Sequence, residues 1–417
     1  MNTLTVLFLV FLVASLAVRQ WLLHRHLGHV LGHRHAVPED FRDRISLADH
    51  RKAADYTATK LRFHRWDLVV EALILLTWTL GGGLDLLDGA WRALDLGPLH
   101  TGVAVLLSIT LIGMLIDLPV SAYQTFVIEE QFGFNRTTPR VFLADHAKQV
   151  LLLVALMAPL LYAVLWVLDN AGPLWWLYAW LIWLGFSLTL VWAYPVFIAP
   201  LFNRFEPLDE GEVRRRVEDL LSRNDLASDG IFVMDGSRRS GHGNAYFTGF
   251  GRHKRIVFFD TLLKSLAPDE VEAVLAHEVG HFKRRHVIKR IAVSAVTSLA
   301  GLALVAWLMN QAWFYHGLGV TNPSGYAALA LFFLVLPVFT FVLQPMGAWL
   351  SRRHEFEADE FAARQADGGA LINALVKLYQ ENAATLTPDP LYSAFHDSHP
   401  PAPIRVAHLK ALGQAAR

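Results

Sequence analysis

The chain has 417 residues, of which 54% are hydrophobic and only 18% are charged, and its mean hydropathy is +0.34. Soluble domains carry about 25% charged residues, so this composition indicates a polytopic membrane protein. Lysine plus arginine and aspartate plus glutamate number 37 each, which gives no excess positive charge for a nucleic-acid partner. The chain has no cysteine, which excludes disulfides, thiolate metal sites and thiol nucleophiles and leaves 19 histidines as nitrogen ligands.

Long apolar runs predict seven membrane spans, each near the ~20 residues that a bilayer requires. The first run resembles the apolar part of a signal peptide, but no basic residue precedes it, so we expect it to remain as a span. The predicted fold class is therefore a mainly helical, polytopic membrane protein. The predicted spans are 3–23, 67–88, 101–124, 149–168, 174–200, 288–312 and 326–349.

The charges of the loops predict an orientation. Basic residues crowd the loop after the first span, and Arg352 and Arg353 follow the last one, whereas loops two, four and six hold no basic residue except Arg92. Because basic loops stay in the cytoplasm, we expect the N-terminus outside and the C-terminus inside. The two water-exposed parts, 201–285 and 351–417, are then cytoplasmic.

The first water-exposed part contains predicted strands followed by a predicted helix. The segment "GNAYFTGFGRHKRIVFFD" indicates two short strands about a Gly-Arg-His-Lys turn. The next segment, "APDEVEAVLAHEVGHF", indicates a helix that begins near Pro268 with acidic residues in its first turn.

This helix carries an HExxH motif, His277-Glu278-Val279-Gly280-His281. Residues four apart share a helix face, so both imidazoles can reach one metal ion. Glu278 can take a proton from a water molecule at that metal, whose pKa zinc lowers to about 7. The alternative is a pair of surface histidines that bind nothing.

A catalytic zinc ion needs a third protein ligand and an open position. The segment "RRHEFEADEFA" places Glu355 and Asp359 four apart on one helix face. Glu355 can then bind the metal, while Asp359 orients a ligand histidine or reaches the substrate. The alternative is a solvated acidic face, which we expect for Glu357 and Glu360.

With these motifs in order, the chain resembles the zinc-dependent CAAX prenyl protease 1 family of seven-span membrane metalloendopeptidases. The resemblance implies one zinc ion per chain, bound by His277, His281 and Glu355, with Glu278 as general base. It also implies that the helices enclose a water-filled chamber. The segments that carry it are "IEEQFGFNRTT", "PVFIAPLFNRFEPL", "NAYFTGFGRHKRIVFFDTLL", "AVLAHEVGHF", "SRRHEFEADEFA" and "HDSHPPAPIR".

The resemblance implies further site residues. Asp359 matches an acid that is usually given a proton-donor role, and His399 and Arg405 match positions that face the substrate carbonyl or oxyanion. A donor near the metal would stabilise that oxyanion. Asn244 matches the start of a substrate-binding edge strand, beside which a peptide can add as a further strand. The predicted substrate-binding residues are Asn244, Ala245, Tyr246 and Phe247.

The chain then divides into four predicted units. Residues 1–200 form spans one to five, 201–285 the catalytic unit, 286–350 spans six and seven, and 351–417 a segment that completes the zinc site. Within the third span, Asp117 either faces the chamber or makes a buried structural hydrogen bond.

The expected activity is hydrolysis of peptide bonds in membrane-associated or prenylated proteins, with the bilayer as second partner. The alternative is a seven-span transporter, receptor or inactive scaffold with a structural metal site. A site-2-type protease is excluded, because 322–325 has no carboxylate and falls on the outer side. The absence of cysteine and the Ala/Leu/Arg-rich composition favour a bacterial inner membrane, where the task would be degrading or trimming membrane proteins.

The segment "HRHLGHVLGHRH" at 24–35 contains histidines four apart, which could form a second metal site. A weakly basic segment at the cytoplasmic interface explains the same composition more simply, and we favour that interpretation.

Overall fold

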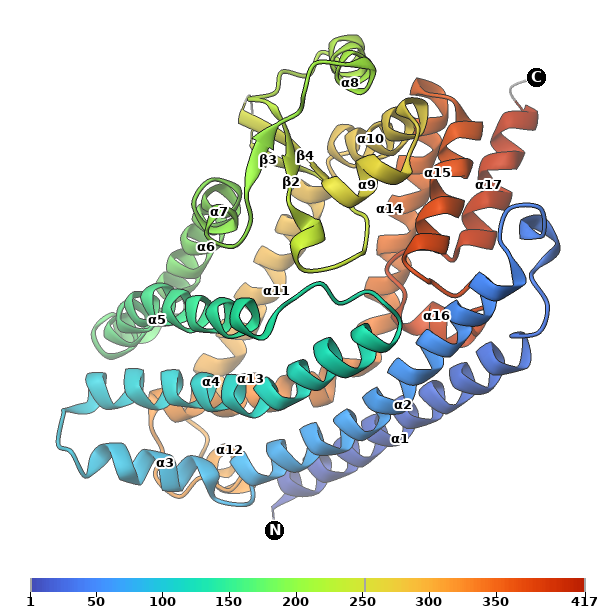
Figure 1. Cartoon of the computed structure of the whole chain (residues 1–417). Coiled ribbons are helices and arrows are strands. Elements are labelled where there is room, and N and C mark those ends of the chain that lie inside the picture. Colours follow the sequence, from blue (N-terminus) through green and yellow to red (C-terminus); the bar gives the residue numbers. More distant parts are fainter. Residues whose placement is uncertain (1, 251–252, 416–417) are drawn as a thin grey trace.

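The computed structural model describes residues 2–250 and 253–415 and is mainly helical (Figure 1). A small sheet and several short helices gather at one end of the long helices. The helices are α1 (Thr3–Gly32), α2 (Leu47–Trp78), α3 (Gly83–Arg92), α4 (Pro98–Tyr123), α5 (Pro139–Asn170), α6 (Trp175–Ala193), α7 (Ala199–Phe202), α8 (Glu212–Arg223), α9 (Asp260–Ser265), α10 (Pro268–Lys283), α11 (His286–Leu308), α12 (Ala312–Gly317), α13 (Gly325–Thr340), α14 (Gln344–Gln365), α15 (Gly368–Glu381), α16 (Pro390–His396) and α17 (Ala402–Ala415).

In the described part of the chain, six helical segments are long and apolar enough to cross a bilayer, and the bent pair α2–α3 makes a seventh. The two helices of this pair meet at 49°. The span predicted over 67–88 is therefore a broken helix pair rather than one continuous helix. The break falls on a run of three glycines, and Gly82 has a φ of +77°, a conformation that other residues rarely adopt.

The seventh span occupies the centre of the bundle. α13 continues through a 3₁₀ turn, Phe341–Leu343, into α14. More than half of its most apolar stretch is buried, because α13 packs against α1, α4, α5 and α11. In the other five apolar segments, only 6–28% of the corresponding stretch is buried, as expected for helices that face lipid.

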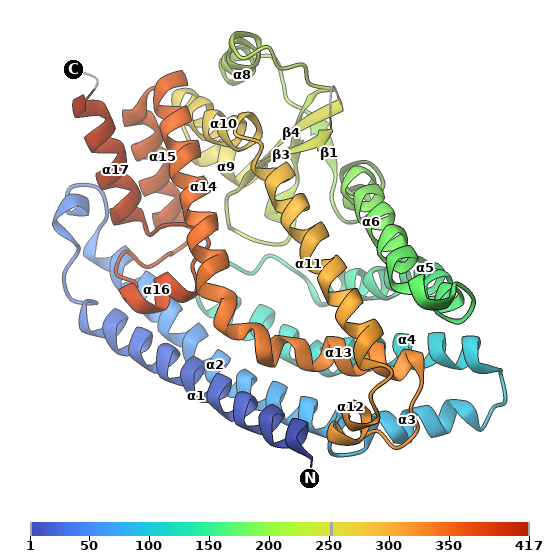
Figure 2. The same cartoon turned by 180° about the vertical axis from the view of Figure 1, so that it is seen from behind.

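The loops between the spans fall into two sets at opposite ends of the bundle (Figures 1 and 2). At one end, the Asn2 amide donates to the Trp313 carbonyl and the Asp85 carboxylate accepts from Thr321. At the other end, Phe41 of the first loop is fully buried in the core of the water-exposed parts. The backbone N–H of Arg136 in the third loop donates to Arg239 at this end. The predicted alternation of loops is thus consistent with the fold.

The sheet has four strands in the order β1–β2–β4–β3: β1 (Phe205–Pro207), β2 (Ile231–Met234), β3 (Ala245–Phe250) and β4 (His253–Phe259). β3 and β4 are the two strands expected from the sequence and pair antiparallel, whereas β2 pairs parallel with β4. The turn expected between β3 and β4 falls partly on residues 251–252, outside the described residues. β3 has a partner on one side only, so it is an edge strand.

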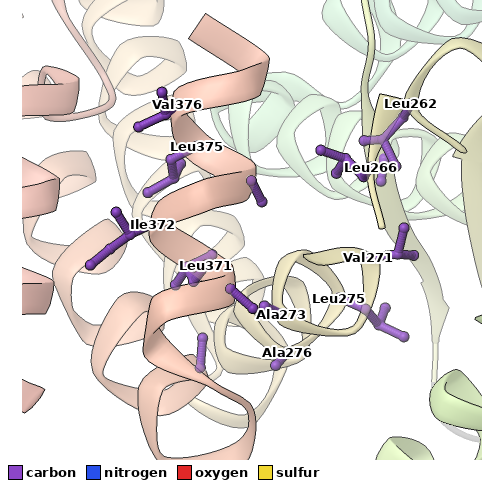
Figure 3. Packing of buried hydrophobic residues seen from close by; sticks show 14 of the residues in the cluster. Leu262, Leu266, Val271, Ala273, Leu275, Ala276, Leu371, Ile372, Leu375 and Val376 are labelled. Carbon is purple, nitrogen blue, oxygen red and sulfur yellow. The ribbon is translucent and has the colours of Figure 1, made fainter. Parts of the chain in front are cut away.

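Helix α10 lies between this sheet and the C-terminal helices. Val271 lies on one side of the helix, and Ala273 faces Leu371 of α15 (Figure 3). All three side chains are buried in one hydrophobic cluster. The helix begins as expected at Pro268, and the Glu270 carboxylate accepts a hydrogen bond of 2.7 Å from the backbone N–H of Ala267. Packing and capping together fix the helix that carries HExxH.

A glycine permits the close crossing of α10 and α14. A β-carbon at Gly280 would lie 3.0 Å from the Ala358 Cα and 3.1 Å from its carbonyl oxygen. Both atoms belong to the backbone of α14, so neither can move without shifting the helix. The spacing between the two helices therefore depends on the absence of a side chain at residue 280.

We expect Gly280→Ala to lower the stability of the protein, because overpacking costs about 1–3 kcal/mol and exceeds the gain of roughly 1 kcal/mol in helix propensity. Melting in detergent micelles measures this effect. Gly301→Ala on α11 is the control, since a β-carbon there would make ordinary contacts at 3.7 Å with the Phe332 ring. Equal stability of the two variants would contradict the proposed close crossing.

Candidate active site

Two imidazole nitrogens on α10 converge on one point. The Nε2 atoms of His277 and His281 lie 3.2 Å apart, one helical turn from each other. Both side chains point from α10 towards α14, the helix against which α10 packs most extensively. The predicted sharing of one helix face is confirmed.

Glu355 of α14 completes this group. Its Oε2 lies 3.4 Å from His277 Nε2, and its Oε1 lies 3.3 Å from His281 Nε2. The residue is 4% exposed, and its Oε2 has no hydrogen-bond partner among the described residues. A buried carboxylate oxygen without a partner is costly, which indicates that the site is built for a cation.

The three residues fit a metal ion. In the described part of the chain, His277, His281 and Glu355 are the one group of three potential ligands whose ligand atoms lie within 4.8 Å of one another. Zinc binds histidine nitrogen and carboxylate oxygen at about 2.0–2.2 Å, so tetrahedral ligand atoms lie about 3.3–3.5 Å apart. The observed spacings of 3.2–3.4 Å are close to this value.

Asp359, one helical turn beyond Glu355, supports His277 from behind. Its Oδ1 lies 2.8 Å from His277 Nδ1, and its Oδ2 accepts from Arg405 Nε at 2.9 Å. Asp359 is fully buried and Arg405 is 7% exposed. The imidazole therefore donates its Nδ1 proton to Asp359 and keeps its Nε2 lone pair free for a metal.

The pKa values of His277 and Arg405 reflect these contacts. Burial by itself lowers the pKa of His277, but the neighbouring Asp359 and Glu355 carboxylates outweigh burial and raise this pKa to about 9. A metal ion must then displace a proton from His277 at neutral pH. Burial by itself also lowers the pKa of Arg405, but the Asp359 carboxylate outweighs burial, so this pKa lies above its usual value and the guanidinium stays charged.

His399, in the segment between α16 and α17, also lies near the metal group. Its Nε2 lies 3.5 Å from Glu355 Oε1, and 65% of its side chain is exposed. The loop that carries it is fastened to α14, because Arg352 donates to the carbonyls of Ser393 and Asp397 at the end of α16. No motif in the sequence indicates this role of Arg352. His399 is thus held near the metal group but remains accessible.

Glu278 has the position that HExxH predicts. It follows His277 on α10 and is half-buried. It makes no hydrogen bond or ion pair with any residue that the structure describes, so its carboxylate is available to a water molecule or a substrate.

The predicted substrate-binding residues lie at the start of the edge strand. Ala245 is buried, Phe247 packs against Phe282 of α10, and Tyr246 is half-buried. Exposed Asn244 lines a cavity of about 690 Å³, to which residues of α2 and of the segment after α15 also contribute. β3 therefore contacts α10 through Phe247, and the residue before the strand, Asn244, lines the cavity.

One expectation is wrong, and the structure bears on two further alternatives. Glu357 is not a solvated acid, because its Oε2 lies 3.1 Å from Nε2 of the fully buried His286. The described histidines of 24–35 form no group of three ligands, and His26 is buried against Tyr392. Asp117 is exposed, which excludes the buried structural hydrogen bond.

A His-His-Glu group beside an edge strand, in a chain with six or seven spans, defines a membrane metallopeptidase. Comparisons with known proteins support this class. Residues 26–204 match the "CAAX prenyl protease N-terminal, five membrane helices" family, and residues 207–413 match "Peptidase family M48".

Curated relatives carry the comparison over the whole chain. The CAAX prenyl protease 1 homolog of Caenorhabditis elegans is 33% identical over 97% of this chain and 98% of its own, and that of Arabidopsis thaliana is 35% identical over 88% of each. The crystal structure of Ste24p from S. mikatae superposes with a TM-score of 0.89 at 29% identity, covering 98% of this chain and 99% of that one. The chain belongs to the CAAX prenyl protease 1 family. The predicted family, fold class and peptidase activity are confirmed, and the transporter, receptor or scaffold alternative is not favoured.

Proposed function

We propose that the protein is a zinc endopeptidase that cleaves extended segments of membrane-associated proteins, with one zinc ion per chain bound by His277, His281 and Glu355. The convergence of the two Nε2 atoms, 3.2 Å apart, on the Glu355 carboxylate, whose oxygens lie 3.4 Å and 3.3 Å from them, carries this proposal. Zinc, when bound, lowers the pKa of a coordinated water molecule to about 7 and polarises the carbonyl to be cleaved.

The remaining chemistry belongs to the side chains around this group. Glu278 takes a proton from the attacking water and delivers it to the leaving nitrogen. Asp359 is fully buried and held by Arg405, so we assign it the orientation of His277 rather than proton donation. His399 is exposed and donates to the carbonyl oxygen as negative charge develops. Arg405 uses Nε and Nη2 on Asp359, which leaves Nη1, 3.8 Å from Glu355, for the same task.

The substrate in this proposal pairs with the free edge of β3. Main-chain hydrogen bonds to Ala245 and Phe247, whose backbone groups face away from β4, fix the register of the peptide. Tyr246, whose backbone pairs with Val257 of β4, contributes its side chain, and Asn244 contacts the peptide backbone at the cavity. Such bonds are made by any sequence, so access through a chamber among the spans selects the substrate. The names of the curated relatives support prenylated proteins as one substrate class.

The proposal also includes an orientation and a division of the chain. The metal group, the basic first loop and the C-terminal helices share one end of the bundle, and we assign this end to the cytoplasm. The composition supports a bacterial inner membrane. Residues 1–200 and 286–350 then form the membrane part, and 201–285 with 351–417 form the catalytic part.

We expect Glu278→Gln to keep its metal and its fold but to lose at least about 100-fold in kcat, because it removes the proton acceptor. Steady-state cleavage of a fluorogenic peptide by the purified protein measures kcat, and metal analysis of the same sample checks loading. Glu210→Gln is the control, since Glu210 is an exposed acid whose only partner among described residues is Arg214. Near-wild-type turnover of metal-loaded Glu278→Gln would rule out the assigned role.

We expect elemental analysis to find one zinc ion per wild-type chain and far less in His281→Ala, because one of three protein ligands is lost. His33→Ala tests the histidine-rich segment with the same side-chain truncation and should keep one zinc ion. Full zinc content in His281→Ala would disprove the ligand set, and loss of zinc in His33→Ala would indicate a site at 24–35.

The orientation can be tested with single cysteines, because the chain has none of its own. We expect Gln380→Cys, on the exposed face of α15, to react with a membrane-impermeant thiol reagent only after cells are opened. Asn322→Cys, exposed in the sixth loop, should react in intact cells and serves as the matched control. Labelling of Gln380→Cys from outside intact cells would reverse the proposed topology.

A further inference from the structure

A buried histidine lies directly behind the second imidazole of the HExxH motif. His286 is the first residue of α11, and its exposed fraction is 0%. Its Nδ1 lies 2.9 Å from Nδ1 of His281. No role for His286 follows from the motif itself, since the residue is five positions beyond His281 and in the next helix.

An unusual backbone conformation brings the two rings together. α10 ends at Lys283, and Arg285 has φ +56° and ψ +33°, the left-handed conformation that non-glycine residues adopt at a cost of roughly 1–2 kcal/mol. This residue reverses the chain so that α11 starts with its first side chain turned back towards α10. A left-handed residue after the C-cap is a common way for a helix to end, and here it also places His286 against α10.

The partners of His286 determine where its proton lies. Its Nε2 lies 3.1 Å from Oε2 of Glu357, and a carboxylate accepts but does not donate. Nε2 therefore carries the proton, and Nδ1 of the neutral ring is an acceptor. His281 must then donate its own Nδ1 proton to His286, which leaves the His281 Nε2 lone pair directed at the metal group.

We call the hydrogen-bonded chain His281–His286–Glu357 the relay. Neighbouring side chains hold His286 and Glu357 of this relay in place. The ring of His286 stacks on His354 with centroids 4.1 Å apart and planes 13° apart. The Glu357 carboxylate also lies near Lys289 at 3.7 Å and Arg353 at 3.4 Å. These cations favour the ionised carboxylate, and the stacking prevents rotation of the His286 ring.

The two ligand histidines are therefore anchored by different groups. His277 donates to the Asp359 carboxylate directly, whereas His281 donates to a neutral imidazole that donates in turn to Glu357. We propose that His286 is a positioning residue that fixes the tautomer and orientation of His281 for zinc. This inference rests on the proposed function, because it requires His281 to be a ligand.

The test compares the release of zinc from variants that keep or remove the acceptor. Losing a hydrogen-bond partner of a ligand usually weakens metal affinity about 10- to 100-fold, and we expect this loss to appear as faster release. His286→Leu should then transfer zinc to an excess of a chromophoric chelator about 10- to 100-fold faster than wild type. His286→Asn offers a side-chain oxygen close to the position of Nδ1 and should restore most of the slow release. His354→Phe preserves the stacked ring and should release zinc at the wild-type rate.

A merely structural role would give a different pattern. His286→Leu and His286→Asn would then lower the melting temperature of the zinc-stripped protein and accelerate release alike. Equal release from these two variants, or unchanged release from His286→Leu, would overturn the inference while the zinc site itself stands. A wild-type protein that binds no zinc would overturn the proposed function and this inference together.

A second variant covers the case in which His286→Leu does not fold. Glu357 is 27% exposed on its side chain, so Glu357→Leu removes the acceptor of the His286 Nε2 proton without opening the core. The tautomer of His286 is then no longer fixed, and zinc release should accelerate. Unchanged release from folded Glu357→Leu would contradict the relay.

Discussion

The structure depends on the contact between α10 and α14, where two imidazoles and a carboxylate share a buried volume. Removing Glu355 and Asp359 from water is expensive unless positive charge compensates them. Arg405 supplies one such charge. The second comes from a proton on His277 in the metal-free protein, which explains its raised pKa, or from a metal cation. The two carboxylates therefore need a second positive charge beside Arg405, and a metal cation can supply it in place of the proton.

The same two helices connect this chemistry to the membrane. α14 continues the central span α13, and α10 is followed after two residues by the span α11. Both histidines and the glutamate thus lie within a few helical turns of a membrane span, so the hydrolytic site is held at the membrane surface. Loops between the spans are attached to the catalytic part at this end, because Phe41 is buried in its core and Arg136 bonds to Arg239.

Much of this arrangement could be predicted from residue spacing. Four-residue spacing on a helix predicts that His277 and His281 share one face, as do Glu355 and Asp359, and apolar length predicts the spans. Local rules could not place α14 beside α10, since 73 residues lie between His281 and Glu355 along the chain. The requirement of a catalytic zinc ion for a third protein ligand suggested that pairing, and the family resemblance supported it. The break between α2 and α3 at Gly82 was not predicted, because the length of an apolar run carries no information about backbone conformation.

Glu357 shows most clearly where sequence reasoning ends. Its position on α14 turns it away from Glu355 and Asp359, and an acid on another face is normally solvated. Its actual partner, His286, depends on the left-handed Arg285 and on the crossing of α10 and α14, neither of which has a sequence signature. Interactions between helices that are set by one unusual dihedral angle can only be found in the structure.

The most direct test of the account is an anomalous difference map from crystals of the purified protein, measured on both sides of the zinc absorption edge. We predict one peak per chain, about 2.0–2.2 Å from His277 Nε2, His281 Nε2 and a Glu355 oxygen. A map without a peak between these three residues, or with its zinc peak at another set of side chains, would contradict the account.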